Sequence, residues 1–159
     1  MLEKLSKGIT SVLVVLCSIT VVGLTLIVAL QVVTRLMNIS LPWTEELARF
    51  FLIWLTFLGC SLALQQESHL SVDFFVNLAP KKVKLVIGLF IRVLMFIFFG
   101  VLLVYGIKLS ILSIDTPSSS LQWPMGLIYG ILPISGVISM FYVVIDTIKF
   151  VKGKEDVTA

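Results

Sequence analysis

GITSVLVVLCSITVVGLTLIVALQVVT, residues 8–34, is a run of apolar and small polar side chains without a charge. Lys7 and Arg35 flank it. A helix rises about 1.5 Å per residue and a bilayer core is about 30 Å thick, so this run is long enough to cross a membrane. It far exceeds the roughly 7 to 15 apolar residues of a secretory signal peptide, and we expect it to remain attached.

Three further apolar runs follow, at about residues 47–65, 83–112 and 125–148. With the first span, at about 8–35, they occupy most of the 159 residues. Hydrophobic residues make up 58% of the chain and charged residues 13%, unlike the composition of a soluble domain. The sequence therefore predicts an all-α integral membrane protein with four transmembrane helices, forming one membrane domain over residues 1–159.

Lysine and arginine are distributed unevenly along the chain. Nine of the twelve lie near the N-terminus, between the second and third spans or just inside the third, and in the C-terminal tail. The other three, Arg35, Arg49 and Lys108, belong to the opposite side. Because positive flanks resist translocation, this bias predicts that both termini are cytoplasmic. The basic residues flank apolar spans, so we interpret them as topology signals and exclude nucleic acid as a partner.

The segment LPWTEELAR, residues 41–49, joins the first two spans. Pro42 suits a first helical turn, and Glu45 and Glu46 then lie near the positive end of the helix dipole. Trp43 is typical of an outer membrane interface. We expect a short amphipathic helix there, lying in that interface. On it, Arg49 is spaced to pair with Glu45 or with Glu46. The alternative is a capped helix start with an aromatic anchor.

The third apolar run is longer than one crossing requires. As a helix from residue 81 to 113 it would be about 50 Å long, so it must tilt or protrude into the cytoplasm. Long basic side chains near that end are expected to snorkel to the headgroups. They form a predicted cytoplasmic basic edge with candidate lipid contacts: Lys81, Lys82, Lys84 and Arg92. A substrate contact by Arg92 is the less favoured alternative.

Proline and glycine are expected to shape the helices. Pro133 removes the hydrogen bond to the carbonyl of Tyr129 and predicts a structural kink in the last span. The small residues Gly88, Gly100 and Gly106 suit close approach between helices. We interpret the kink as a matter of shape and not as a hinge.

Little in the sequence suits catalysis or cofactor binding. Glu45 and Glu46 are adjacent on one helix and close to an arginine, which does not suit paired acid and base catalysis. The single histidine, His69, cannot supply two haem ligands, and Cys17 and Cys60 are expected to be small buried side chains. There is no Gly-rich phosphate loop and no metal-spaced cluster. We therefore expect no enzyme activity, no catalytic residue, no metal and no cofactor.

The middle of each span is uncharged. A proton-coupled carrier usually keeps an ionisable residue deep in a span, and a small four-span exporter needs an acid in its first span. Residues 8–34 contain none, and Gln31 is expected to hydrogen-bond to a neighbouring helix. The chain alone is therefore not expected to carry an ion or an organic anion. The alternative is a self-contained small membrane protein, either an oligomeric exporter or a lipid-associated scaffold.

Three motifs occur in order along the chain. PWTEELARF at 42–50 follows the first span, HLSVD at 69–73 follows the second, and LQWPM at 121–125 opens the fourth. Together they resemble the small membrane subunit of tripartite ATP-independent periplasmic (TRAP) transporters. The resemblance covers nearly the whole chain, including its length and its four spans. The chain departs from the family pattern at SSSLQW, residues 118–123, where a more apolar, glycine-containing segment is expected.

The resemblance implies a division of labour. In the family, a large multispan subunit holds the sodium and substrate sites, and a periplasmic binding protein delivers an organic acid anion such as a dicarboxylate or a sialic acid. By resemblance, this chain is a non-catalytic brace for the large subunit's scaffold in the bacterial inner membrane. Its implied partners are the large membrane subunit, the periplasmic binding protein and membrane lipids. Its candidate partner-interface or anchor residues are Trp43, Glu45, Glu46 and Arg49.

Overall fold

The structure, a computed structural model, describes residues 2–67 and 81–158, with side chains over residues 6–65 and 86–149. Its helices, in chain order, are α1 (Leu2–Leu36), α2 (Pro42–Glu67), α4 (Lys81–Leu112), α5 (Met125–Tyr129) and α6 (Ile131–Thr158). Four stretches of helix are long and apolar enough to cross a membrane: Ser6–Leu36, Pro42–Gln65, Val86–Leu112 and Met125–Lys149. The predicted all-α architecture with four spans is confirmed.

The turn between α1 and α2 ends the first helix sharply. Asn38 adopts a left-handed conformation with φ 58°, which asparagine tolerates better than most residues. The N–H of Ile39 bonds to the carbonyl of Thr34 at 2.9 Å, and the N–H of Asn38 bonds to that of Arg35 at 3.1 Å. This pair of bonds is the Schellman pattern that satisfies the last carbonyls of a helix.

No separate helix precedes the second span in this part of the chain. Helix α2 begins at Pro42 and runs without a break to Glu67, so residues 42–49 form its first turns. The location of these turns at the membrane interface stays a prediction.

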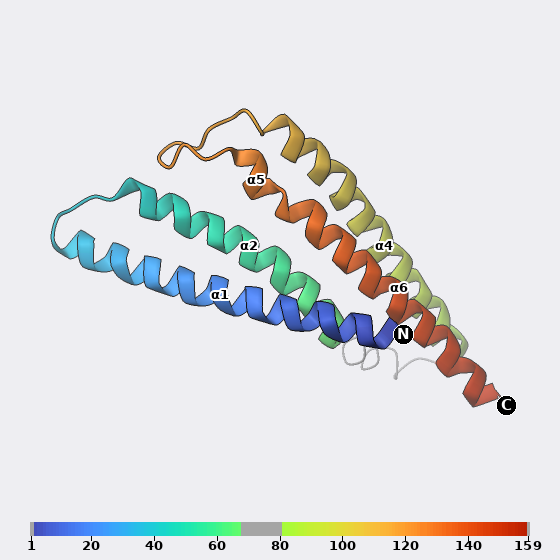
Figure 1. Ribbon diagram of the computed structural model, residues 1–159. Helices are drawn as coiled ribbons and strands as arrows, with labels where there is room; N and C mark the ends of the chain where they lie inside the picture. The colour runs from blue at the N-terminus through green and yellow to red at the C-terminus, as the bar shows by residue number, and fades with distance from the viewer. Residues whose placement is uncertain (1, 68–80, 159) are drawn as a thin grey trace.

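The helices form two antiparallel hairpins arranged as a fan (Figure 1). Helix α1 packs on α2, α2 on α6, and α6 on α4, so the order across the fan is α1, α2, α6, α4. The hairpins converge where both termini lie, which we call the terminal end. They spread apart at residues 37–41 and 113–124, which we call the loop end.

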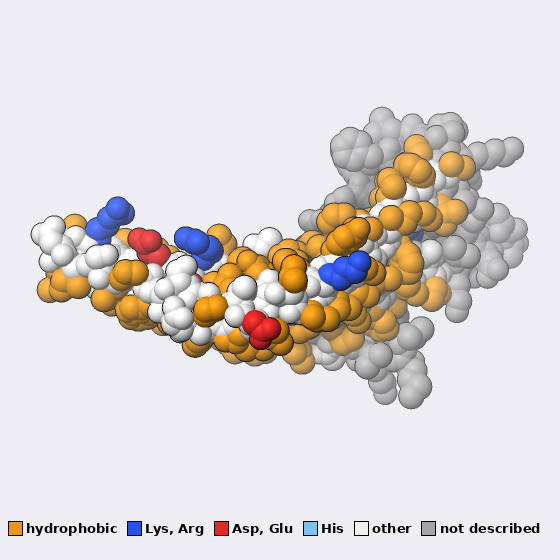
Figure 2. Space-filling view, turned by 90° about the horizontal axis from the view of Figure 1, so that it is seen from above, with side chains coloured by type: hydrophobic (Ala, Val, Ile, Leu, Met, Phe, Trp, Pro, Cys, Tyr) orange, Lys and Arg blue, Asp and Glu red, His pale blue; other side chains and the backbone are white. Residues whose placement is uncertain are grey.

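This arrangement leaves most of the apolar surface uncovered. Within their most apolar stretches, α1, α2 and α4 each have 17% of residues buried inside the chain, against 39% for the span that contains α6. On the face seen in Figure 2, hydrophobic side chains run along the molecule and are interrupted by scattered charges. Helix α6 is therefore the central element.

The core lies toward the terminal end, where α1, α2 and α6 meet. Its buried residues are Leu13, Leu58, Ile131 and Tyr142. Since lipid tails are as apolar as these side chains, close packing and polar contacts hold the helices together. The hydroxyls of Thr10 and Tyr142 lie 3.0 Å apart and join α1 to α6.

A second polar contact, made by small side chains, joins α2 to α6. The hydroxyls of Ser61 and Ser139 lie 2.9 Å apart, and Ser61 also donates to the carbonyl of Ser135 at 3.3 Å. All three serines are buried. Small residues at this position allow the two helix backbones to approach closely.

The last span is interrupted between α5 and α6. The break lies at Gly130, three residues before Pro133. The N–H of Ile134 still bonds to the carbonyl of Gly130, at 3.4 Å. The interruption lies in the region where a kink was expected, and its attribution to Pro133 stays a prediction.

Candidate functional site

Residues at the start of α2 lie at the loop end and fall into two groups. Trp43 has 38% of its surface exposed, and Glu45 and Arg49 are also exposed. These three side chains therefore lie where a partner or a headgroup can reach them. Over residues 6–65 and 86–149, the structure places no ion pair at Arg49, so neither pairing expected for it is formed.

Glu46 turns the other way, toward the loop between α4 and α5. Its Oε1 accepts a hydrogen bond from the backbone N–H of Ser119 at 3.0 Å. Its Oε2 accepts bonds from the N–H groups of Ser120 at 2.8 Å and Leu121 at 2.9 Å. We call this set of bonds the Glu46 clasp. Hydrogen bonds to an ionised acceptor are roughly twice as strong as neutral ones, so the clasp is stronger than three neutral bonds at the same place would be.

The loop is folded so that its N–H groups converge on that carboxylate. The N–H of Ser118 bonds to the carbonyl of Trp123 at 2.8 Å, and the Ser118 hydroxyl accepts a bond from the N–H of Trp123 at 3.2 Å. Gln122, between them, takes a left-handed conformation with φ 56°. Residues 117 and 124 close the base of the loop as an antiparallel bridge. The turn thus presents three successive donors, a geometry that binds an anion.

An apolar cavity of about 340 Å³ lies beside the clasp, between α2 and α5. Phe50, Trp54, Trp123 and Leu127 are among its lining residues. On its wall, the indole N–H of Trp54 donates to the carbonyl of Ile128 at 3.3 Å. The two hairpins therefore meet around a space that their own side chains do not fill.

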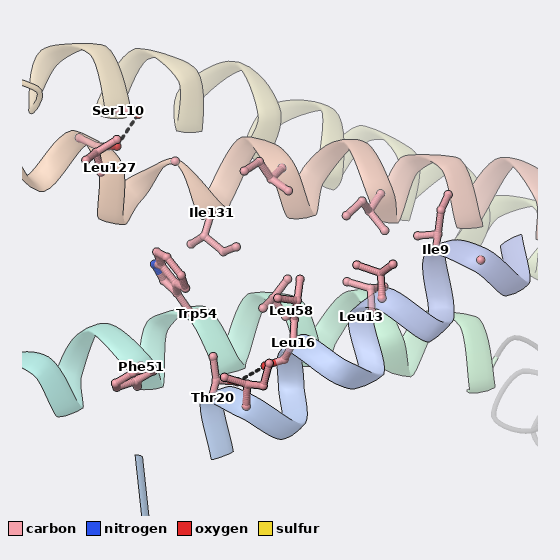
Figure 3. A pocket seen from close by; sticks show the side chains of 17 residues that line it. Ile9, Leu13, Leu16, Thr20, Phe51, Trp54, Leu58, Ser110, Leu127 and Ile131 are labelled. Carbon is pink, nitrogen blue, oxygen red and sulfur yellow. Dashed lines mark hydrogen bonds between the residues drawn. The ribbon is translucent and has the colours of Figure 1, made fainter. Parts of the chain in front are cut away.

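A larger apolar groove of about 1050 Å³ lies between α1, α2 and the last span (Figure 3). Its polar side chains are already bonded within the chain. The hydroxyl of Thr20 donates to the carbonyls of Leu16 and Cys17, and the hydroxyl of Ser110 donates to that of Gly126 at 2.6 Å. The groove thus offers no charged group to an organic anion.

An ion pair lies inside the spans at the terminal end. Arg92 Nε donates to Asp146 Oδ2 at 2.8 Å, and the two side chains are 7% and 18% exposed. The structure therefore differs from the expected snorkelling of Arg92, because its guanidinium group faces α6 and is buried. Lys81, Lys82 and Lys84 begin α4, but their side chains lie outside the described residues, so their lipid contacts stay predictions.

Asp146 was missed by sequence reasoning. The available signal was an acid a few residues inside the last span, at the same depth as an arginine in the third span. An ionisable residue at such a position usually has a partner. Because the pair lies near one end of both spans, the middle of the spans remains neutral, as expected.

Several other expected features have definite positions. The side-chain nitrogen of Gln31 is buried and has no hydrogen-bond partner among the described residues, so it makes no interhelical bond there. Both cysteines were expected to be buried. Cys17 is half-buried, whereas Cys60 is exposed. His69 and the HLSVD motif lie outside the described residues. The residues that the structure describes contain no cluster of metal-ligating side chains.

Comparison with known proteins identifies the family. Residues 24–153 match the family described as tripartite ATP-independent periplasmic transporters, DctQ component. The sialic acid TRAP transporter small permease protein SiaQ of Vibrio cholerae is 27% identical over 148 residues, covering 88% of this chain and 82% of that protein.

Two longer relatives also match. The sialic acid TRAP transporter permease protein SiaT of Haemophilus influenzae is 29% identical over 130 residues, which cover 78% of this chain and 20% of SiaT. The isethionate TRAP transporter permease protein DctMQ of Oleidesulfovibrio alaskensis is 28% identical over 95 residues, covering 58% of this chain and 15% of that protein. This chain thus spans a fifth or less of these two relatives.

The matched family consists of transporter components, which agrees with the expectation that the chain is not an enzyme. The match covers most of the chain and includes the start of α2, the Glu46 clasp and the Arg92–Asp146 pair. The chain is a member of the DctQ component family of TRAP transporters.

Proposed function

We propose that this chain braces the large membrane subunit of a TRAP-type secondary transporter during uptake of an organic acid anion. The chain itself carries neither the anion nor the coupling ion. Uptake is driven by sodium, and a periplasmic binding protein delivers the cargo. The relatives are named for sialic acid and isethionate, and we assign this transporter to organic acid anions as a class.

The observation that carries this proposal is the combination of uncovered apolar surface with an absence of free charge in the groove. In α1, α2 and α4, most residues of the apolar stretches face away from the chain's own core. The groove between the hairpins is lined by apolar residues and bonded hydroxyls. A fan of this kind is suited to lie against another membrane-embedded body, and the residues that line its groove include none of the ionisable groups that transport sites use.

The proposed location is the bacterial inner membrane, with both termini in the cytoplasm. In this orientation the loop end, with Trp43, Glu45 and Arg49, faces the periplasm. These exposed residues are the proposed anchor or partner contacts at that surface. Membrane lipids cover the apolar surface that the large subunit leaves free.

The test has two parts. The first deletes this chain in its host and measures the uptake of organic acid anions, and the second is a pull-down of the tagged chain. We expect uptake to be lost on deletion and to return when the chain is supplied again. We expect mass spectrometry of the pull-down to find a large membrane protein. Normal uptake after deletion would contradict the proposal. Recovery of homo-oligomers alone would favour the alternative of a self-contained membrane protein.

A further inference from the structure

The Glu46 clasp connects the two hairpins at the end where they diverge. Its acceptor belongs to α2, and its donors belong to the loop between α4 and α5, 73 to 75 residues further along the chain. Close to the clasp, the hairpins border the apolar cavity of about 340 Å³ and do not form a packed core there. The indole bond from Trp54 to the carbonyl of Ile128 is a weaker neighbouring contact, at 3.3 Å. The clasp is therefore well placed to set the spacing of the hairpins at the loop end.

The three bonds require a carboxylate at this position. An ionised glutamate has two oxygens and no donor, so it can face three N–H groups at once. Glutamine keeps one oxygen but replaces the other with an NH₂ group, which would point donors at donors. Alanine leaves the three N–H groups to water. Glutamine therefore removes the negative charge and at least one of the three bonds with little change in side-chain volume.

Glu45 provides a contrast on the same helix. It is adjacent in sequence and also acidic, yet its side chain is exposed and makes no clasp bond. Adjacent residues on a helix point about 100° apart, so only one of the two can face the loop. The two acids therefore have different roles, although both were expected at a partner interface.

We propose that Glu46 is a positioning residue, whose carboxylate fixes the Ser119–Leu121 backbone against α2 and holds the two hairpins together at the loop end. Its charge is used inside the chain and not on a partner. The consequence for transport rests on the proposed function, because a loosened brace lowers uptake only if the chain supports a transporter. The clasp itself can be tested on this chain independently of transport.

The experiment is hydrogen exchange with mass spectrometry on the full chain in nanodiscs, together with any membrane protein that copurifies. We expect Glu46→Gln and Glu46→Ala to speed exchange of the Ser119–Leu121 amides by about tenfold or more, because each loses a charge-assisted acceptor. Glu46→Asp keeps the charge with a shorter reach, so its exchange should lie between those of the wild type and Glu46→Gln. Glu45→Gln is the matched control and should leave exchange in this loop unchanged.

Exchange in the core of α6, at residues 135–142, serves as a check on folding. It should not change in Glu46→Gln. General acceleration that includes this core would overturn the proposal of a local clasp, as would unchanged loop exchange in Glu46→Gln. Equal exchange in Glu46→Asp and Glu46→Gln would also count against it, because the charge would then have no role.

A parallel pull-down separates this proposal from a partner contact at Glu46. We expect Glu46→Gln to copurify with the large membrane protein as well as the wild type does, while uptake falls. Loss of copurification with unchanged loop exchange would assign Glu46 to the interface and overturn the proposal. Faster loop exchange with unchanged uptake would support the clasp and count against the bracing function.

Discussion

Arg92 and Asp146 join α4 to α6 by an ion pair, and the strength of this pair depends on how far both charges are removed from water. Besides its bond to Asp146, Arg92 Nη1 donates to the carbonyl of Gly88 at 3.2 Å. In a low-dielectric environment, two charges attract strongly, but each has also lost its hydration. Removing one partner leaves the other charge buried and uncompensated, which is costlier than removing both.

Single replacements of this pair should therefore destabilise the chain more than the double replacement. We expect Arg92→Ala or Asp146→Asn to lower the free energy of unfolding by about 3 kcal/mol, and Arg92→Met with Asp146→Leu to cost clearly less. The reversed pair, Arg92→Asp with Asp146→Arg, should recover part of the loss. Thermal unfolding in detergent measures these differences, with exposed Lys108→Ala as the control. Additive effects of the single changes would contradict a direct pairing.

At the scale of elements, the last span can approach α4 closely because glycines, which have no side chain, lie at the contact. A Cβ atom at Gly126 would lie 2.5 Å from the carbonyl oxygen of Ser110 and 2.8 Å from the Cα of Ile114. At Gly106 it would lie 3.0 Å from the Cβ of Leu132, whereas at Gly100 it would meet nothing within 4 Å. Gly126 and Gly106 thus set how closely the helices approach, and Gly100 does not.

Alanine substitutions should distinguish a glycine in close contact, Gly126, from a glycine next to open space, Gly100. We expect Gly126→Ala to destabilise the chain by about 1–3 kcal/mol, because its Cβ meets backbone atoms that cannot move aside easily. Gly100→Ala should be neutral or slightly stabilising, since alanine is the better helix former. Denaturation of both variants in the same detergent measures this. Equal stability of the two variants would show that the close approach at Gly126 is not important.

The elements were largely predictable from sequence, and their contacts were not. Charge-free runs define spans because bilayer thickness sets their length. Spacing along one helix predicted a pairing of Glu45 with Arg49. The same spacing carries no information about the loop that bonds to Glu46, because the first donor of that loop lies 73 residues further along the chain. Small-residue reasoning included Gly106 and missed Gly126, because only the packed structure shows which glycine faces a backbone.

At the scale of the whole molecule, the distribution of charge predicts one orientation in the membrane. Both termini lie at the terminal end, as an even number of crossings requires (Figure 1). Nine of the twelve basic residues belong to the side on which the termini lie, while Arg35, Arg49 and Lys108 belong to the side of the loop end. Positive flanks resist translocation, so this asymmetry favours the terminal end in the cytoplasm.

Reporter fusions test that orientation directly. Alkaline phosphatase is active only after export, so we expect a fusion after Ala159 to be inactive and one after Ile39, in the turn between α1 and α2, to be active. Green fluorescent protein fused after Ala159 should fluoresce, because it folds in the cytoplasm. An inactive phosphatase fusion at Ile39, together with an active one at Ala159, would show that the orientation is the opposite of the one predicted. The exposed start of α2 would then face the cytoplasm, where no periplasmic binding protein could meet it.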